Sequence, residues 1–326
     1  MVLSMATPRV SFGDDILMID VQDLRKSYGE LVAVDGVSFT AGRGSVFGLL
    51  GPNGAGKSTT ISCISGLLQP TGGRVSVLGH DVTRDGRAAR QHLGIVPQEL
   101  ALYGELSATD NLSYWGAAYG LRGSALKGRV GAVLEVTGLA DRAQEPVKTF
   151  SGGMQRRLNF GCGIVHQPQV LLLDEPTVGV DPQSRVRLLD LVREQVADGT
   201  CVLYTTHYME EAQALCDQIG IIDHGKLLAL GTLNELRGMM GERDILRLTG
   251  RFEPARARAA VGRLEHAEVV TADEGLLMLS VEAATRMLPA IFSALSDAGA
   301  EVQETTLTQP SLESLFIKLT GRELRE

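Results

Sequence analysis

Short apolar segments alternate with glycine-containing turns over residues 16–79, and this pattern predicts a start rich in β-strands. Between residues 99 and 165 the apolar positions recur at helical spacing, with glycine breaks. The run 126–137, for example, is closed by Gly138. We therefore expect a helical insertion over about 99–165.

The centre of the chain carries two uniformly apolar segments, residues 170–173 and 201–204, separated by a helical run at 184–196. Continuous apolar runs of this length are typical of parallel strands that are buried on both faces. A third apolar strand is expected at 219–222, after a helix around 209–216. The centre is thus predicted to be α/β.

Beyond a glycine-rich joint at 238–241, the chain is predicted to form a second, smaller α+β domain that resembles a ferredoxin-like βαββαβ unit. A final helix over 311–320 follows Pro310, whose fixed φ suits a helix entry. We predict a leader at 1–15, a large domain at 16–238 and an accessory domain at 242–326. The six elements of the ferredoxin-like unit are expected at 245–249, 254–264, 268–271, 276–281, 284–298 and 301–306.

Composition places the chain among ordinary globular proteins, with 44% hydrophobic and 21% charged residues in 326. Since about eighteen apolar residues never run together, we predict no membrane-spanning helix. The net charge is -8 and no long basic block occurs, so nucleic acid is not predicted as a partner. The four cysteines lie far apart and predict neither a zinc site nor disulfides.

Residues 51–59 read G-P-N-G-A-G-K-S-T and fit the pattern G-x-x-x-x-G-K-[ST], between an apolar strand at 46–50 and an apolar helix at 60–68. The glycines let backbone N–H groups turn toward one point at a helix N-terminus, which is a ready anion site. Lys57 would neutralise the β- and γ-phosphates of ATP, and Ser58 would hold Mg²⁺. The motif predicts a P-loop NTPase.

Two carboxylates, Asp174 and Glu175, end the apolar strand at 171–173, where open α/β sheets bind ligands. Taken alone, an acidic pair at a strand end is a common surface feature. With a phosphate loop upstream, we assign Asp174 to the metal and Glu175 to the attacking water, on opposite sides of the strand. His207, just beyond the strand at 201–206, is expected to donate to a γ-phosphate oxygen.

The segment Phe-Ser-Gly-Gly-Met-Gln-Arg-Arg at 150–157 resembles the signature of the ATP-binding cassette (ABC) ATPases, and the resemblance covers about residues 16–232. It implies a head-to-tail dimer, with a second copy of this chain or a homologous ATPase subunit, in which each ATP lies between Lys57 of one subunit and Ser151 and Gly153 of the other. It also implies that Tyr28 stacks on adenine and that Gln98 touches Mg²⁺ and couples the nucleotide to a membrane partner.

The resulting site has four groups of residues. The catalytic group is Lys57, Gln98, Glu175 and His207; the ATP-binding group is Tyr28, Gly51, Pro52, Asn53, Gly54, Ala55, Gly56, Lys57, Ser58, Thr59, Gln98, Asp174 and His207; the Mg²⁺ ligands are Ser58, Gln98 and Asp174; and the group facing the partner's ATP is Ser151, Gly152, Gly153, Met154, Gln155 and Asp181.

The ending at 310–322 resembles the C-terminal segment of ATPase subunits in bacterial exporters of the daunorubicin-resistance kind. That resemblance implies a separate polytopic permease, a drug, lipid or glycan as cargo, and a place on the cytoplasmic face of the membrane. The alternative is a soluble ABC ATPase of DNA repair, chromosome organisation or translation. A small-molecule kinase would have no use for the signature segment.

Overall fold

The computed structural model describes residues 17–240, 243–308 and 311–321, so the predicted leader at 1–15 and Pro310 lie outside the described residues. The chain divides into two compact units, Met1–Leu227 and Leu228–Glu326. The domain limits 16–238 and 242–326, which place the boundary later in the chain, stay a prediction.

The first unit contains a four-stranded antiparallel sheet in the order β2-β1-β4-β5. Val34 and Val37 of β2 lie opposite Lys26 and Leu24 of β1 and are fully buried. This sheet confirms the β-rich start. Its strands are β1 (Leu17–Tyr28), β2 (Leu31–Gly42), β4 (Gly72–Val77) and β5 (His80–Asp81).

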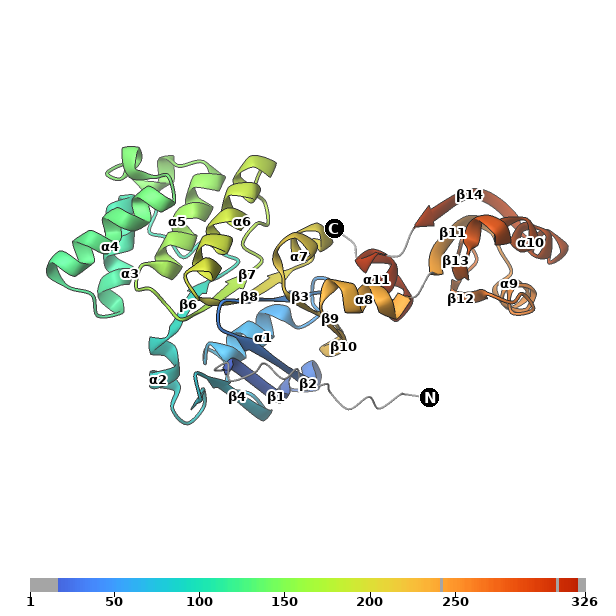
Figure 1. The fold of residues 1–326 in the computed structure, drawn as a ribbon, viewed down its shortest axis with the longest axis horizontal. Coiled ribbons are helices and arrows are strands. Elements are labelled where there is room, and N and C mark those ends of the chain that lie inside the picture. Colours follow the sequence, from blue (N-terminus) through green and yellow to red (C-terminus); the bar gives the residue numbers. More distant parts are fainter. Residues whose placement is uncertain (1–16, 241–242, 309–310, 322–326) are drawn as a thin grey trace. The chain divides into compact units, whose positions relative to one another are not determined.

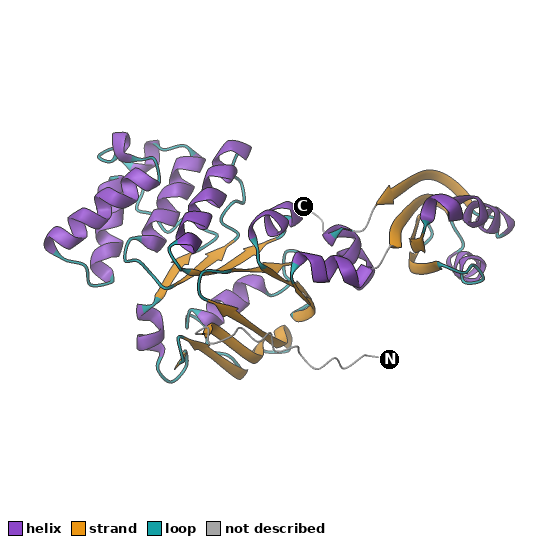
Figure 2. Ribbon diagram, in the orientation of Figure 1, coloured by secondary structure: helices purple, strands orange, loops and turns teal. Residues whose placement is uncertain are grey.

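A six-stranded sheet in the order β10-β9-β3-β8-β7-β6 forms the centre of the fold, and its middle strands run parallel (Figure 2). Every residue of β3, β7 and β8 is buried, because helices cover both faces of a parallel sheet. The bounds are β3 (Val46–Leu50), β6 (Leu93–Val96), β7 (Val170–Asp174), β8 (Cys201–Thr206), β9 (Gln218–Asp223) and β10 (Lys226–Gly231).

Helix α1 (Lys57–Ile64) contacts β2 and β4 of the antiparallel sheet and β7 of the parallel sheet, and so lies between the two layers (Figure 1). The expected helical insertion consists of α3 (Ala108–Ala118), α4 (Gly123–Val136) and α5 (Gly152–Ile164), which pack on one another. The remaining helices of this unit are α2 (Gly86–Gln91), α6 (Pro182–Ala197) and α7 (Met209–Leu215).

The second unit contains the predicted βαββαβ order, in an antiparallel sheet arranged β12-β13-β11-β14. Side chains of α9 and α10 share one buried core with alternate residues of β11 and β13. The bounds are β11 (Arg243–Arg251), α9 (Pro254–Val261), β12 (Ala267–Ala272), β13 (Leu276–Glu282), α10 (Ala284–Asp297), β14 (Glu301–Thr308) and α11 (Leu312–Thr320).

The glycine-rich joint expected at 238–241 is wrong in part, because α8 (Leu233–Met240) runs through Gly238 as a helix. Thr232 and Glu235 form its capping box: the Thr232 N–H donates to Glu235 Oε2 at 2.7 Å, and the Glu235 N–H donates to Thr232 Oγ1 at 3.3 Å. Leu236 is fully buried, and α8 packs against α11. Capping and packing together outweigh the helix penalty of one glycine.

Candidate functional site

The loop at 51–56 leads from β3 into α1 at the carboxyl edge of the parallel sheet, as predicted. Gly56 has a φ of 103°, and a Cβ there would lie 2.5 Å from Ala33 O, so no other residue fits this turn. Around Gly54, at φ 79°, a Cβ would meet nothing within 4 Å. The loop is therefore braced from behind by β2 and open in front, where the first N–H groups of α1 lack helical partners.

Lys57 is the first residue of α1, and its side chain is only 3% exposed. Its Nζ donates to Gly51 O at 2.7 Å and to Pro52 O at 2.9 Å, and it lies 2.9 Å from Glu175 Oε1. The ammonium group is thus held over the loop by two carbonyls and one carboxylate. Phosphate oxygens brought to this loop would meet a cation that is already in place.

Glu175 stands at the end of β7 with a φ of 44°, in the left-handed region that only a few non-glycine residues occupy. Its Oε2 lies 3.1 Å from His207 Nδ1, so Glu175 is held between His207 and Lys57. β7 ends at Asp174, and Glu175 begins the turn that follows it. The predicted placement of the two carboxylates on opposite sides of the strand stays a prediction.

Asp174 is buried and accepts a hydrogen bond from Thr205 Oγ1 at 2.7 Å. Burial raises the pKa of this carboxyl, while hydrogen bonds from Thr205 and Ser58 act in the opposite direction. Among the described residues, no group of three or more His, Cys, Asp or Glu could hold a metal alone. One carboxylate beside one hydroxyl nevertheless fits Mg²⁺, which takes few protein ligands when it also binds phosphates.

Thr205, which the sequence analysis did not select, contacts both acidic residues from the neighbouring strand β8: the carboxylate of Asp174 and the backbone N–H of Glu175. It is fully buried, donates to Asp174 and accepts from the Glu175 N–H at 3.0 Å. The signal was present in the sequence: a hydroxyl residue two positions before His207 points to the same sheet edge. Thr205 is recognised as a residue of the site by its position on the strand next to Asp174, because it is distant from Asp174 in sequence.

Glu211 of α7, another buried carboxylate, was also missed. It accepts hydrogen bonds from Thr177 Oγ1 at 2.7 Å, Thr206 Oγ1 at 2.8 Å and Tyr204 OH at 2.9 Å. Thr177 belongs to the turn that follows Glu175, and Thr206 precedes His207. This network ties the segments behind the two predicted catalytic residues to α7.

Gln98 and Tyr28 lie at the edges of this site. Gln98 follows β6, whose Val96 pairs with Leu173 beside Asp174, and its side chain is exposed. Tyr28 is the last residue of β1 and is 45% exposed, with Lys26 Nζ 5.1 Å from the ring centroid. Their predicted contacts with Mg²⁺ and adenine stay predictions.

The signature segment opens α5. Ser151 is the N-cap, accepting from the Met154 N–H at 3.3 Å, and a Cβ on Gly152 would meet nothing within 4 Å. At Gly153, by contrast, a Cβ would lie 2.1 Å from Ser184 Oγ. Gly152 thus leaves open space, whereas Gly153 is required for close packing on α6 of the same chain.

Met154, Gln155 and Asp181 have partners within the chain. Arg142 Nη1 lies 3.4 Å from Met154 Sδ, and Gln155 Nε2 donates to Val147 O at 3.2 Å. Asp181 is the N-cap of α6, where Oδ1 accepts from the Ser184 N–H at 2.9 Å. That bond lowers the pKa of Asp181. Their predicted contacts across a dimer are not tested by these contacts.

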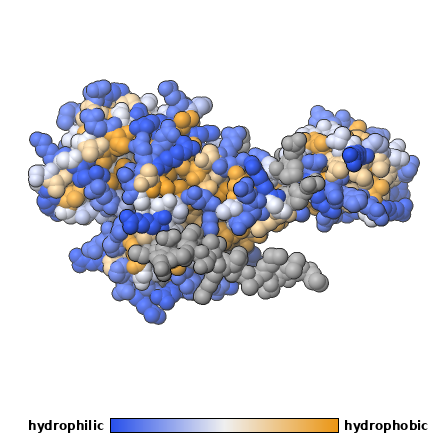
Figure 3. Space-filling view, in the orientation of Figure 1, coloured by the Kyte–Doolittle hydropathy of each residue, from blue (hydrophilic) through white to orange (hydrophobic). Residues whose placement is uncertain are grey.

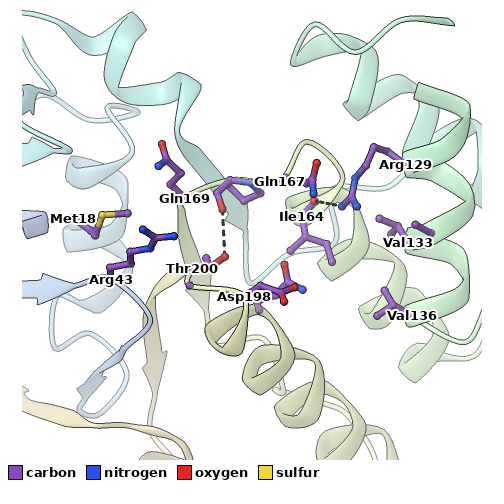
Figure 4. A pocket seen from close by; sticks show the side chains of 14 residues that line it. Met18, Arg43, Arg129, Val133, Val136, Ile164, Gln167, Gln169, Asp198 and Thr200 are labelled. Atoms are coloured by element: carbon purple, nitrogen blue, oxygen red, sulfur yellow. Dashed lines mark hydrogen bonds between the residues drawn. The ribbon is translucent and has the colours of Figure 1, made fainter. Parts of the chain in front are cut away.

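A pocket of about 360 Å³ lies elsewhere in the first unit (Figure 4). Gln169 and Thr200 in its lining precede β7 and β8, and Arg43 follows β2. It therefore lies at the amino edge of the parallel sheet, whereas Lys57, Asp174, Glu175 and the phosphate loop lie at the carboxyl edge. The pocket is not part of the predicted site.

A phosphate loop after β3, an acidic pair at the end of β7 and a histidine directly after β8, the strand between these two, define a P-loop nucleotide-binding cassette. The profile of the ABC transporter family matches residues 34–178. The chain is 44% identical over 312 residues to the linearmycin resistance ATP-binding protein LnrL of Bacillus subtilis (strain 168), covering 95% of this chain and 100% of that protein. This chain belongs to the ATP-binding proteins of the ABC transporter family.

One further relative and one solved structure support the same family assignment. The daunorubicin/doxorubicin resistance ATP-binding protein DrrA of Streptomyces peucetius is 40% identical over 308 residues, 93% of this chain and 92% of that protein. A solved structure described as the ATP binding subunit of an ABC transporter superposes with a TM-score of 0.64 at 32% identity, over 69% of this chain and 93% of that one. In the described part of this chain, no helix is long and apolar enough to cross a membrane.

Proposed function

We propose that this chain hydrolyses ATP to power export of a drug, lipid or glycan through a separate permease, as a dimer on the cytoplasmic face of a bacterial membrane. The observation that carries the hydrolytic part is Glu175, which is buried between Lys57 and His207 beside the phosphate loop. The names of LnrL and DrrA, both resistance ATP-binding proteins, support the transport part. They favour a transporter over a soluble ABC ATPase.

In this mechanism the loop at 51–56 and Lys57 would hold the phosphates of ATP, and Asp174 and Ser58 would hold Mg²⁺, which would supply positive charge opposite the phosphate oxygens. Glu175 accepts a proton from the attacking water, since its carboxylate stands at the end of the strand where the γ-phosphate would lie. His207 fixes that carboxylate and donates to the γ-phosphate.

Two helix N-termini that could each bind an anion support the proposed dimer. Lys57 and Ser151 both stand at helix N-termini, one in the sheet domain and one in the helical insertion. Each ATP would bind Lys57 of one subunit and Ser151 of the other, so that nucleotide closes the dimer and hydrolysis opens it.

A permease would dock on apolar side chains beside Gln98. Leu100, Tyr103, Leu106 and Tyr114 are all more than a third exposed, and the rings of Tyr103 and Tyr114 meet edge to face with centroids 5.0 Å apart. Figure 3 shows apolar residues between polar ones on one face of the molecule. Exposed aromatic clusters of this kind mark contact surfaces.

Light scattering with and without ATP tests the proposal. Glu175→Gln should bind ATP, fail to hydrolyse it and remain a dimer, and Ser151→Arg in that background should be monomeric. An ATP-bound Glu175→Gln protein that stays monomeric in the presence of the permease would refute the dimer. Detergent extraction should retain a polytopic membrane partner, and its absence would favour the soluble alternative.

A further inference from the structure

Four exposed arginines gather around α2 in the first unit. They are Arg74 on β4, Arg84 just ahead of α2, and Arg87 and Arg90 on α2 itself. Residues 66–92 contain these four arginines and only two acidic residues, although the whole chain carries a net charge of -8. We call the four residues the arginine surface, and it is a positive region on an acidic protein.

Three adjoining hollows shape the arginine surface. One of about 310 Å³ is lined in part by Arg87 and Arg90, one of about 370 Å³ by Arg74 and Arg84, and one of about 380 Å³ by Arg84 and Arg87. Each hollow shares lining residues with the other two, and none is lined by a residue predicted to bind ATP. The arginine surface is therefore continuous and separate from the nucleotide site.

Two of these guanidinium groups have no partner in the described part of the chain. The side chains of Arg84 and Arg87 make neither a hydrogen bond nor an ion pair there. Asp81 lines the same hollow as Arg84, but its Oδ1 accepts from the backbone N–H groups of Thr83 at 2.9 Å and Arg84 at 3.1 Å. Its Oδ2 lies 3.5 Å from Arg74 Nε. Two guanidinium forks, which suit phosphate oxygens, thus face outward.

An exposed leucine lies beside the arginines. Leu67, in the turn after α1, is 71% exposed, more than any other large apolar side chain among the described residues. A Cβ on Gly66 would lie 3.1 Å from Arg90 Nη1, so Arg90 lies against the turn that carries Leu67. Gly66 and Leu68 also line the same hollow as Arg90. Leu67 therefore projects next to the arginine surface.

We propose that the arginine surface and Leu67 contact the anionic headgroups of the membrane, with the arginines on lipid phosphates and the leucine in the interface. Anionic lipid attracts a cluster of basic residues, and an apolar side chain that enters the interface adds to this attraction. A permease fits less well, because the cytoplasmic loops of membrane proteins carry an excess of Lys and Arg. The inference rests on the proposed place at the membrane and names the residues that meet the lipid.

The position of α2 in the fold supports this contact. Helix α2 packs against β6, the edge strand of the parallel sheet, and Figure 1 shows it at the outer margin of the first unit. The four residues of β6 then lead to the loop that carries Gln98, beside which the permease is proposed to dock. Lipid contact at α2 would hold the chain against the membrane close to that docking surface.

Cosedimentation of the full-length chain with vesicles tests the proposal, using phosphatidylcholine alone and phosphatidylcholine mixed with phosphatidylglycerol. Each arginine near an anionic surface strengthens binding about fivefold, so Arg84→Gln with Arg87→Gln should weaken binding to the mixed vesicles roughly twentyfold. Leu67→Ser should weaken it several-fold. Neither change removes a contact within the described residues, so the fold should be retained.

Matched controls separate this surface from net charge and from exposed apolar area. Arg258→Gln with Arg263→Gln removes the same charge from exposed positions in the second unit, and Val186→Ser changes a side chain that is 59% exposed on α6. Both controls should bind the mixed vesicles as the wild type does. Binding should also fall steeply between about 0.1 and 1 M salt, because salt screens the attraction.

Several results would overturn the lipid contact. Equal binding of the wild type to neutral and mixed vesicles, or an equal loss in the arginine control pair, would do so. Release by inorganic phosphate at constant ionic strength would assign the arginines to a soluble anion, and binding only to vesicles that contain the permease would assign them to a protein. The assay needs neither ATP nor hydrolysis, so its failure is distinct from failure of the proposed ATPase activity, which all these variants should retain in solution.

Discussion

Replacing Thr205 by valine removes the hydroxyl that binds the Asp174 carboxylate and the Glu175 N–H, while keeping the shape of the side chain. Asp174 loses a charge-assisted hydrogen bond of 2.7 Å, and the buried Glu175 N–H loses its acceptor. The first loss costs about 1.5–3 kcal/mol and the second about 1–3 kcal/mol. The added methyl contact offsets about 0.8 kcal/mol. We expect a net loss of roughly 2–5 kcal/mol.

Urea unfolding measures this loss, and Trp115 reports it, because it is the single tryptophan of the chain and belongs to the first unit. Thr205→Ser is the control: it keeps the hydroxyl and loses only a methyl group, at about 1 kcal/mol. The valine variant should also lose kcat, since the Asp174 carboxylate and the backbone N–H of Glu175 both lose their hydrogen-bond partner. Unfolding free energies for the two variants within about 0.5 kcal/mol of each other would refute the role assigned to the hydroxyl.

Three further predictions concern stability. Burial lowers the pKa of His166 to about 4, so neutral His166 contributes fully to the free energy of unfolding above pH 6.5, and this contribution is lost as the pH falls to 4. His166→Phe should flatten the pH dependence of the unfolding free energy in this range by at most about 3 kcal/mol. An unchanged pH dependence would contradict the prediction. Gly153→Ala should lower the free energy of unfolding by about 1–3 kcal/mol, because the new Cβ would clash with the Ser184 side chain. Adding Ser184→Gly should remove the clash and restore stability. Urea unfolding that shows no rescue in the double variant would contradict the prediction. Glu211→Gln should lower the free energy of unfolding by about 2–4 kcal/mol. Three hydroxyls donate to the two carboxylate oxygens of Glu211, whereas a glutamine amide has one acceptor oxygen. A smaller loss than in the neighbouring variant Gln213→Ala would contradict this prediction.

Local signals were sufficient for most elements. The apolar runs predicted β7 and β8 and the parallel core, and the order of six elements in the second unit was predicted within a few residues at each end. The missed helix α8 had a local signal, the pair Thr232 and Glu235 at capping-box spacing. The two glycines nearby, 238 and 241, instead favoured a joint at this position.

The phosphate loop, Asp174, Glu175 and His207 could be placed at one sheet edge from sequence, because each follows a strand and parallel strands end at the same edge. The strained backbone of Glu175 could not. The left-handed φ of Glu175 occurs together with contacts of its carboxylate to Lys57 and His207, which are distant in sequence, and no spacing rule encodes this combination.

The sequence by itself determined the chemistry of the site. A phosphate loop, two carboxylates and a signature at a helix start are local patterns that can be recognised without knowing the tertiary structure. Only the tertiary structure decided which residues hold those groups in place. Thr205 lies 30 residues from Glu175, and Asn159 lies 62 residues from Pro97, yet each pair is within hydrogen-bond distance. Such contacts depend on how strands and helices pack against one another, and the pattern of side chains along the chain does not specify that packing.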